Sequence, residues 1–381
     1  MGRRRQRIAV EDHPPHNNVT TEMSSDIILF HILPRLPVKS LRRFQCVSKQ
    51  WHSFLTTPEF SKMQLHHVIT NQDHHKLLVL SNTAPYKRII DCENPEKKTA
   101  QSPLPFKGIS LVRSKSILTS FHGMVCIAIE NRLYAFEVAY FDLIIWNPST
   151  GEYKTLSKAH YHKEIYHING GTFGLYYSSS DDDYKLLRIS RHPNVYIYSL
   201  KSDSWRKVEL TETFRPLYHR FSCNSKPSVL LNEKLYFLEQ TGRDGNLTPC
   251  LYLLIRFDIN TEKFTEIVTP FSGNTTIDSL SIMVQGGCIH LFATISQHAE
   301  LWRMDGDEVW TKVETSFSSS QKPLHLMRNG KWIVHSDCGN VYQVNMKTHY
   351  RRKLYSLRKS DDDIVLEDYM ETIVSPNQYM K

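Results

Sequence analysis

The sequence predicts an α+β protein: a small N-terminal all-α unit followed by an all-β, propeller-like domain. Between residues 26 and 60, apolar side chains recur at separations of three and four, which is the period of helices that face a core. Beyond residue 65, short apolar or alternating runs end in turn residues, as is typical of strands. A strand–turn–aromatic pattern recurs there about every 40–60 residues, close to the length of a propeller blade.

The first helix is expected at the start of the N-terminal unit. Ile28, Ile32 and Leu36 are spaced by four residues, so that they share one face of a short helix. Pro34 and Pro37 bracket the turn that follows, because proline cannot donate a backbone N–H to a continuing helix.

Two further short helices are expected after this turn. Leu41, Phe44 and Val47 recur at a separation of three, which predicts a second helix from about Val38. Ser48 can cap a third helix. The apolar positions of that third helix are Trp51, Phe54 and Leu55. Three helices of this size cannot bury all their apolar side chains among themselves, which predicts a partner surface.

The same residues carry a family resemblance. The runs 36–41 (LPVKSL), 46–49 (CVSK) and 58–60 (PEF), together with Trp51, closely resemble the F-box of plant F-box proteins. In that family the box docks on a Skp-type adaptor, which tethers it to a cullin-based ubiquitin ligase. The chain departs from the family pattern where Met23-Ser24 replaces the usual Leu-Pro and His31 replaces the usual Glu.

The resemblance implies which residues hold the adaptor. Leu36, Pro37, Leu41, Val47 and Trp51 match family positions that form the core and the docking face of the box. The apolar stripe of the first helix adds two residues to the expected docking set, Ile28 and Ile32.

The second part of the chain predicts about six blades, with five or seven also compatible. The aromatic residue after each turn marks five units: Tyr153, Trp205, Phe264, Trp310 and Tyr350. The apolar runs within 76–91 suggest one more blade before them. The runs 146–152 (WNPSTGE) and 310–312 (WTK) resemble the plant F-box-associated domain, which is similar in style to kelch propellers. Kelch-type Gly-Gly pairs occur only at 170 and 286, so strict kelch repeats are not expected.

These patterns divide the chain into four parts. A polar segment at 1–22 is expected to be a disordered tail. The F-box-like unit covers 23–65, and the propeller-like domain covers 66–357. Residues 358–381, with three consecutive aspartates and a polar end, are expected to form a frayed tail. The two folded units are expected to share little core.

Composition bounds the cellular setting. The 381 residues are 40% hydrophobic and 23% charged, with a net charge of +8, as in an ordinary globular protein. The basic cluster at 3–7 could be a nuclear signal or a nucleic-acid arm, but solvated charge is the preferred interpretation. No run reaches the ~18 apolar residues of a membrane span. Seven scattered cysteines without a Cys-x-x-Cys pair indicate reduced thiols, and therefore the cytoplasm or the nucleus.

The sequence predicts no catalytic residue, no metal site and no cofactor. The histidine groups at 66–67, 74–75 and 160–167 lack a Cys or acidic partner at ligand spacing. Glycine-rich phosphate loops and nucleophile elbows are absent. The strands expected to line the propeller channel, including 124–129 and 288–292, carry almost no Asp or Glu, which argues against a propeller hydrolase.

The leading hypothesis is a substrate-recognition subunit of an SCF-type ubiquitin ligase. The partners would be a Skp-type adaptor, a cullin held indirectly and a target protein of unknown identity, with no nucleic acid and no membrane. The first alternative is an adaptor-bound scaffold that acts outside any ligase. The second is a propeller enzyme with an incidental helical N-terminus.

Overall fold

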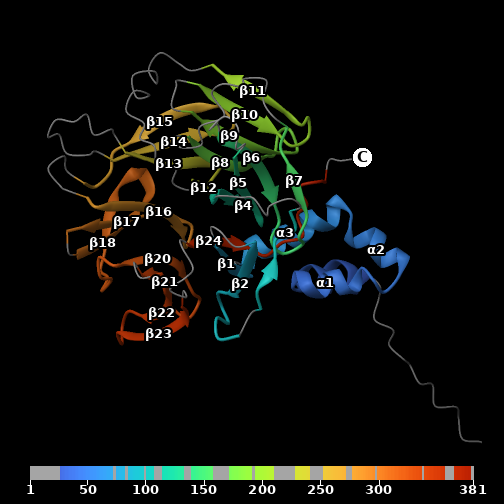
Figure 1. The fold of residues 1–381 in the computed structure, drawn as a ribbon, viewed down its shortest axis with the longest axis horizontal. Coiled ribbons are helices and arrows are strands. Elements are labelled where there is room, and N and C mark those ends of the chain that lie inside the picture. Colours follow the sequence, from blue (N-terminus) through green and yellow to red (C-terminus); the bar gives the residue numbers. More distant parts are fainter. Residues whose placement is uncertain are drawn as a thin grey trace, which may run out of the picture.

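The computed structural model places a group of helices against one end of a ring of sheets (Figure 1). The described residues are 26–71, 74–81, 85–97, 100–106, 114–132, 139–157, 171–190, 194–209, 228–240, 252–271, 277–296, 298–336, 339–356 and 364–378. The expected disordered tail at 1–22 lies outside this set. None of the described helices is both long and apolar enough to cross a membrane.

The helical unit (residues 26–71) opens with two unusual turns instead of the expected single α-helix. Ile27–Ile32 forms a π-helix, in which the N–H of Leu33 bonds to the carbonyl of Ile28. Leu33–Arg35 then tightens into a 3₁₀-helix with Pro34 near its start. Leu36 ends the segment in an extended conformation, since a following proline disfavours the helical region.

Three α-helices follow: α1 (Val38–Phe44), α2 (Lys49–Leu55) and α3 (Pro58–Asn71). The predicted cap of α2 is confirmed, because the Ser48 hydroxyl accepts a hydrogen bond from the Trp51 N–H at 3.1 Å. The long helix α3 was not expected. Its signal is Thr57 before Pro58, since the Thr57 hydroxyl accepts from the Phe60 N–H and proline suits a first helical position. The predicted boundary after residue 65 falls inside α3.

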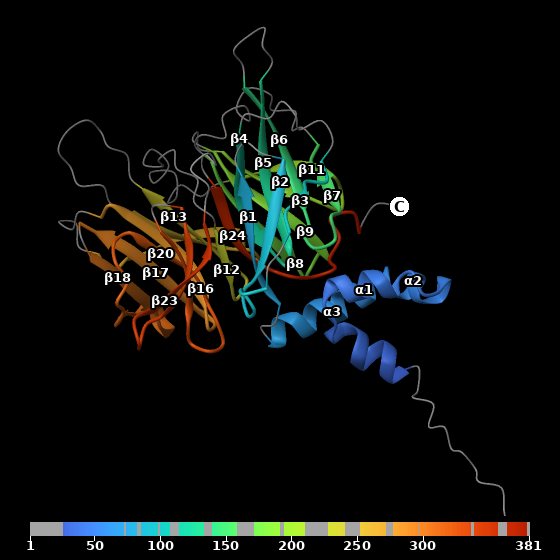
Figure 2. The same ribbon diagram turned by 60° about the horizontal axis from the view of Figure 1, so that its bottom comes forward.

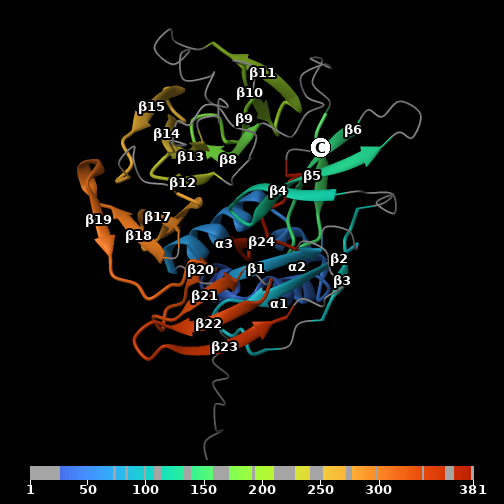
Figure 3. The same ribbon diagram turned by 60° about the vertical axis from the view of Figure 1, so that its left-hand side comes forward.

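The described strands form six four-stranded antiparallel sheets, which confirms a propeller of six blades. Figure 3 shows the sheets standing around a central axis. The first two blades after the helices contain β1 (His75–Ser81), β2 (Tyr86–Asp91), β3 (Ser102–Pro103), β4 (Ser114–Phe121), β5 (Met124–Arg132), β6 (Ala139–Trp146) and β7 (Tyr153–Thr155).

The next two blades contain β8 (Thr172–Ser178), β9 (Asp183–Ile189), β10 (Val195–Ser199), β11 (Ser204–Val208), β12 (Val229–Leu231), β13 (Lys234–Gln240), β14 (Tyr252–Asp258) and β15 (Lys263–Ile267). The last two blades contain β16 (Ser279–Gln285), β17 (Cys288–Ile295), β18 (His298–Met304), β19 (Trp310–Val313), β20 (Gln321–Leu326), β21 (Trp332–Ser336), β22 (Val341–Asn345) and β23 (Tyr350–Tyr355). The final strand is β24 (Ile364–Met370).

The ring is closed by the end of the chain. Strand β24 pairs with β1 over seven residues, from His75 opposite Met370 to Ser81 opposite Ile364, and so completes the first blade. The expectation of a frayed tail at 358–381 is therefore wrong over β24. Because β1 also pairs with β2, pairing with β24 satisfies the backbone groups on both sides of β1 and covers a sheet edge that would otherwise be exposed.

The expectation that the two units share little core is also wrong. Ile373, just after β24, packs with Leu41 and Phe60 in the core of the helical unit. Leu65 of α3 packs in turn among residues of the blades that contain β4–β7 and β8–β11. Figure 2 shows α3 lying at one end of the strands of these blades. Because residues of both units share these cores, the helical unit is packed against the propeller and is not joined to it by a linker alone.

Candidate functional site: helical surface and propeller axis

The structure separates the seven expected docking residues by exposure. Val47, in the turn after α1, leaves 63% of its surface exposed, whereas Leu41 is fully buried. Leu41 therefore shapes the surface from within the core and cannot contact a partner. The remaining residues of the expected set are at least partly exposed: Ile28, Ile32, Leu36, Pro37 and Trp51.

Sequence reasoning missed two exposed apolar residues of the π-helix. Ile27 and Phe30 leave 45% and 48% of their surface exposed. The Phe30 ring meets the edge of Phe54, with centroids 5.8 Å apart, and Phe44 meets Trp51 at 5.4 Å. The available signal was the uninterrupted apolar run 27–30, which is too wide for one buried stripe. Isolated exposed apolar residues are ordinary, but several on one small unit indicate an interaction surface.

A second candidate lies on the propeller axis. The blades meet through their innermost strands, which are β4, β8, β12, β16, β20 and β24. A cavity of about 740 Å³ lies between them, with walls from β4, β12, β16, β20 and β24. Its volume falls within the range of small-molecule sites.

The expected scarcity of acidic residues in the channel needs correction. The runs 124–129 and 288–292 are second strands of their blades, not innermost ones. Among the six innermost strands, acidic residues occur in β24 only, as Glu367 and Asp368. Both lie in the segment expected to be a tail, and both line the axial cavity.

Glu367 lies in surroundings that favour its neutral form. Burial raises the pKa of this carboxyl to about 7, although a hydrogen bond from Ser120 and the nearby charge of Lys322 act in the opposite direction. The Ser120 hydroxyl donates to Glu367 Oε1 at 2.6 Å. Burial lowers the pKa of Lys322 as well, so each group is pushed toward its uncharged form.

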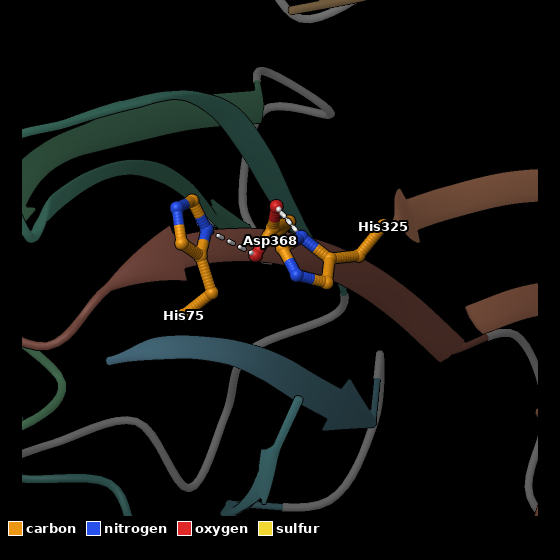
Figure 4. Close-up of side chains that lie close together, drawn as sticks. All are labelled: His75, His325 and Asp368. Carbon is orange, nitrogen blue, oxygen red and sulfur yellow. Dashed lines mark hydrogen bonds and ion pairs between the residues drawn. The ribbon is translucent and has the colours of Figure 1, made fainter. Parts of the chain in front are cut away.

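Asp368 lies between two imidazole rings (Figure 4). Its Oδ1 is 3.2 Å from His75 Nδ1, and its Oδ2 is 3.0 Å from His325 Nδ1. Burial alone would raise the pKa of Asp368, but the charges and hydrogen bonds of the two histidines outweigh burial and hold this pKa well below its usual range. Asp368 is therefore a carboxylate at neutral pH.

The two faces of the propeller carry different connections between strands. The turns after β6 and β8 face the helical unit, where Arg42 donates to the Thr150 carbonyl at 2.9 Å and Lys62 lies 2.8 Å from Asp182. Successive connections of an antiparallel sheet alternate between its two ends. Strands β7 and β11 therefore end, and strands β8 and β12 begin, at the face away from the helices.

Comparisons with known proteins agree with both parts of the fold. The family described as "F-box associated beta propeller domain" matches residues 124–372, and the "F-box domain" family matches residues 22–63. F-box protein At2g21930 of Arabidopsis thaliana is 27% identical over 78% of this chain and 72% of its own length. F-box protein CPR1 of the same plant is 26% identical over 76% of this chain and 71% of its own length.

Proposed function

Because the chain belongs to the F-box proteins that carry an F-box associated beta-propeller domain, we propose that it is a substrate-recognition subunit of an SCF-type cullin ubiquitin ligase. The helical unit would bind a Skp-type adaptor, and the propeller would bind a target protein. Members of this family generally act as adaptors rather than enzymes. Catalysis would come from bringing the target close to the ubiquitin-carrying enzyme, which raises its effective concentration.

One observation supports adaptor binding most directly. The helical unit presents apolar side chains to solvent, led by Val47 at 63% and Phe30 at 48% exposure. A bound adaptor would remove this surface from water at about 25 cal/mol per Å² of apolar area. The surrounding core, which includes Leu41 and Phe60, holds the exposed residues in place before binding.

The target would bind at the propeller face away from the helices. At that face, long stretches of sequence separate β7 from β8, β11 from β12 and β13 from β14, whereas the helix-facing turns such as 122–123 and 286–287 are short. Long connections on a rigid scaffold are the usual carriers of binding specificity. Adaptor and target would thus occupy opposite ends of one rigid body.

The test is capture of partners by the full chain. Wild-type chain, co-expressed with a Skp-type adaptor and a cullin, should retain both through purification. Val47→Asp should reduce adaptor capture at least about tenfold, because it places a charge in the apolar contact. The matched control is Val268→Asp, since Val268 is 81% exposed but lies on the propeller after β15.

The outcomes separate the competing functions. Adaptor and cullin together support the ligase, whereas adaptor without cullin supports a scaffold outside it. Capture of neither would contradict the proposal. Equal loss of adaptor in the Val47 and Val268 variants would show that the helical unit is not the docking element.

A further inference from the structure

We propose that His75, His325 and Asp368 form a binding site for a divalent transition metal ion, with Zn²⁺ the best match to the ligands. The site is independent of the proposed ligase function. Within the described part of the chain, these residues form the one group of His, Cys, Asp or Glu whose ligand atoms lie close enough together to share an ion.

The three ligands come from three strands that only the closed propeller brings together. His75 begins β1, His325 lies in β20 and Asp368 lies in β24. The pairing of β1 with β24 fixes the positions of His75 and Asp368 relative to each other. In that pair, His75 lies opposite Met370, two residues after Asp368. Ligands held by strands rather than by loops have little conformational freedom to lose on binding.

The distances suit a small ion. Zinc binds histidine nitrogen at about 2.0–2.1 Å and carboxylate oxygen at about 2.0–2.2 Å, usually with tetrahedral geometry. Ligand atoms around such an ion lie about 3.3 Å apart. The carboxylate oxygens of Asp368 lie 3.2 and 3.0 Å from the two histidine Nδ1 atoms, and the three ligand atoms lie within 4.8 Å of one another. Because each Nδ1 faces a different oxygen of Asp368, one imidazole ring would turn toward the shared ion on binding.

The surroundings match those of metal-binding histidines. A ligating histidine usually directs its second ring nitrogen to an outer carboxylate, which orients the ring. Glu93 Oε1 lies 3.9 Å from His325 Nε2, on the side of the ring away from Asp368. The Arg328 N–H donates to the same Glu93 oxygen at 3.3 Å, which holds the carboxylate in place.

The site is enclosed on one side and reachable on the other. The side chain of His325 is only 5% exposed, whereas those of His75 and Asp368 keep 21% and 26% of their surface exposed. His75 and Asp368 both line the 740 Å³ axial cavity, so an ion can enter from it and water can fill a fourth position. Two neutral histidines and one carboxylate leave a net positive charge on a bound Zn²⁺, which suits a water or an anion as the fourth ligand.

The alternative is a purely hydrogen-bonded trio, in which each imidazole N–H donates to one carboxylate oxygen. The two arrangements differ measurably. A bound metal takes the place of the protons on the two Nδ1 atoms, so metal binding releases those protons to solvent. A metal would also tie β20 of the last blade to β1 and β24 of the first, and so stabilise the closed ring.

The experiment uses the full chain, stripped of metal and titrated with Zn²⁺ in competition with a chromophoric chelator. We expect one Zn²⁺ per chain, with a Kd tighter than about 1 µM. Asp368→Asn and His325→Ala should each weaken binding at least about tenfold. Glu93→Gln should weaken it by a smaller factor, because this residue only orients a ligand.

Two control variants test the location. His290→Ala removes a buried histidine of β17 outside the group and should leave Zn²⁺ affinity unchanged. The double variant His66→Ala with His67→Ala removes the adjacent histidines of α3 and should also leave it unchanged. Loss of affinity in this double variant, with normal binding in Asp368→Asn, would overturn the proposal.

A second measurement removes any dependence on variant folding. Co²⁺ added to the stripped wild-type chain should give the visible absorption of a low-symmetry nitrogen–oxygen site, and one equivalent of Zn²⁺ should abolish it. Wild-type chain that binds Zn²⁺ no more tightly than Asp368→Asn, or that shows no Co²⁺ absorption, would establish the hydrogen-bonded trio instead.

Discussion

The helical unit and the propeller differ in the range of the contacts that hold them together. Among the described residues, the buried core of the helical unit is built from neighbours in sequence, Leu33 to Phe60, together with Ile373. The propeller depends on a contact between opposite ends of the domain, since β24 pairs with β1. One short segment, 364–374, therefore completes both units.

The turn at Asn147 holds this segment in place. The buried Asn147 amide donates to the carbonyls of Thr372 and Val374 at 2.9 and 2.8 Å. Ile373, between them, enters the helical core, whereas Val374 packs with the blade residues. The Ile373 N–H also donates to the side-chain oxygen of the buried Gln64 of α3 at 3.2 Å. The two units should therefore unfold together.

The largest expected effect comes from breaking this shared segment. Deletion of residues 364–381 should abolish the cooperative fold, because it opens the ring and removes Ile373 from the helical core. A domain with a total stability of about 5–15 kcal/mol cannot absorb the loss of a whole strand. Soluble yield and a thermal melt by circular dichroism measure it. Deletion of 379–381 is the control and should leave the melt unchanged. If the longer truncation keeps a helical unit that melts cooperatively, segment 364–374 is not needed to complete that unit.

The next effect sharpens the contrast between core and surface within the helical unit. Leu41→Ala should destabilise the chain by about 2–5 kcal/mol, because Leu41 is fully buried. Val47→Asp should change stability by no more than about 0.5 kcal/mol, because Val47 is exposed. Urea unfolding measures both variants, and adaptor capture should fall in both. A stable Leu41→Ala chain that loses the adaptor would show that Leu41 contacts the partner directly.

Local patterns were sufficient to predict much of the fold. Helices α1 and α2 follow from apolar spacing and from the Ser48 cap, and the six blades follow from repeated strands and turns. The first helix was only partly predicted, because apolar spacing does not distinguish an α-helix from the π-helix and 3₁₀-helix that Pro34 and Pro37 favour here.

Long-range features were not predictable in the same way. The run of aspartates at 361–363 suggested a solvated end, yet β24 follows it directly and finds its partner strand near residue 75. The His75, His325 and Asp368 group was missed for the same reason. Sequence spacing can reveal ligands on one helix or hairpin, but these three residues meet only after the ring closes.

The smallest expected effect concerns His122, a propeller residue that contacts the segment 364–374, and is measured by changing the pH. His122, in the turn between β4 and β5, stacks on Phe121 and bonds through Nδ1 to the Tyr184 hydroxyl at 3.1 Å. Its carbonyl accepts a hydrogen bond from Thr372 at 2.7 Å, next to the segment that enters the helical core. Burial lowers the pKa of His122 to about 3. The neutral ring is therefore the form that the folded chain accommodates.

The sign of the pH effect follows from this depressed pKa. In the unfolded chain the imidazole titrates near its usual pKa of about 6.5, so its contribution to stability is complete above that pH. It declines by about 1.4 kcal/mol per pH unit as the pH falls from about 6.5 toward 3. His122→Gln removes this proton and should flatten the dependence of unfolding free energy on pH by that slope, whereas His290→Ala should leave the His122 contribution in place. Urea melts between pH 7 and 5 measure the difference. If unfolding free energy falls with pH equally in wild type and His122→Gln, the folded chain accommodates a charged His122.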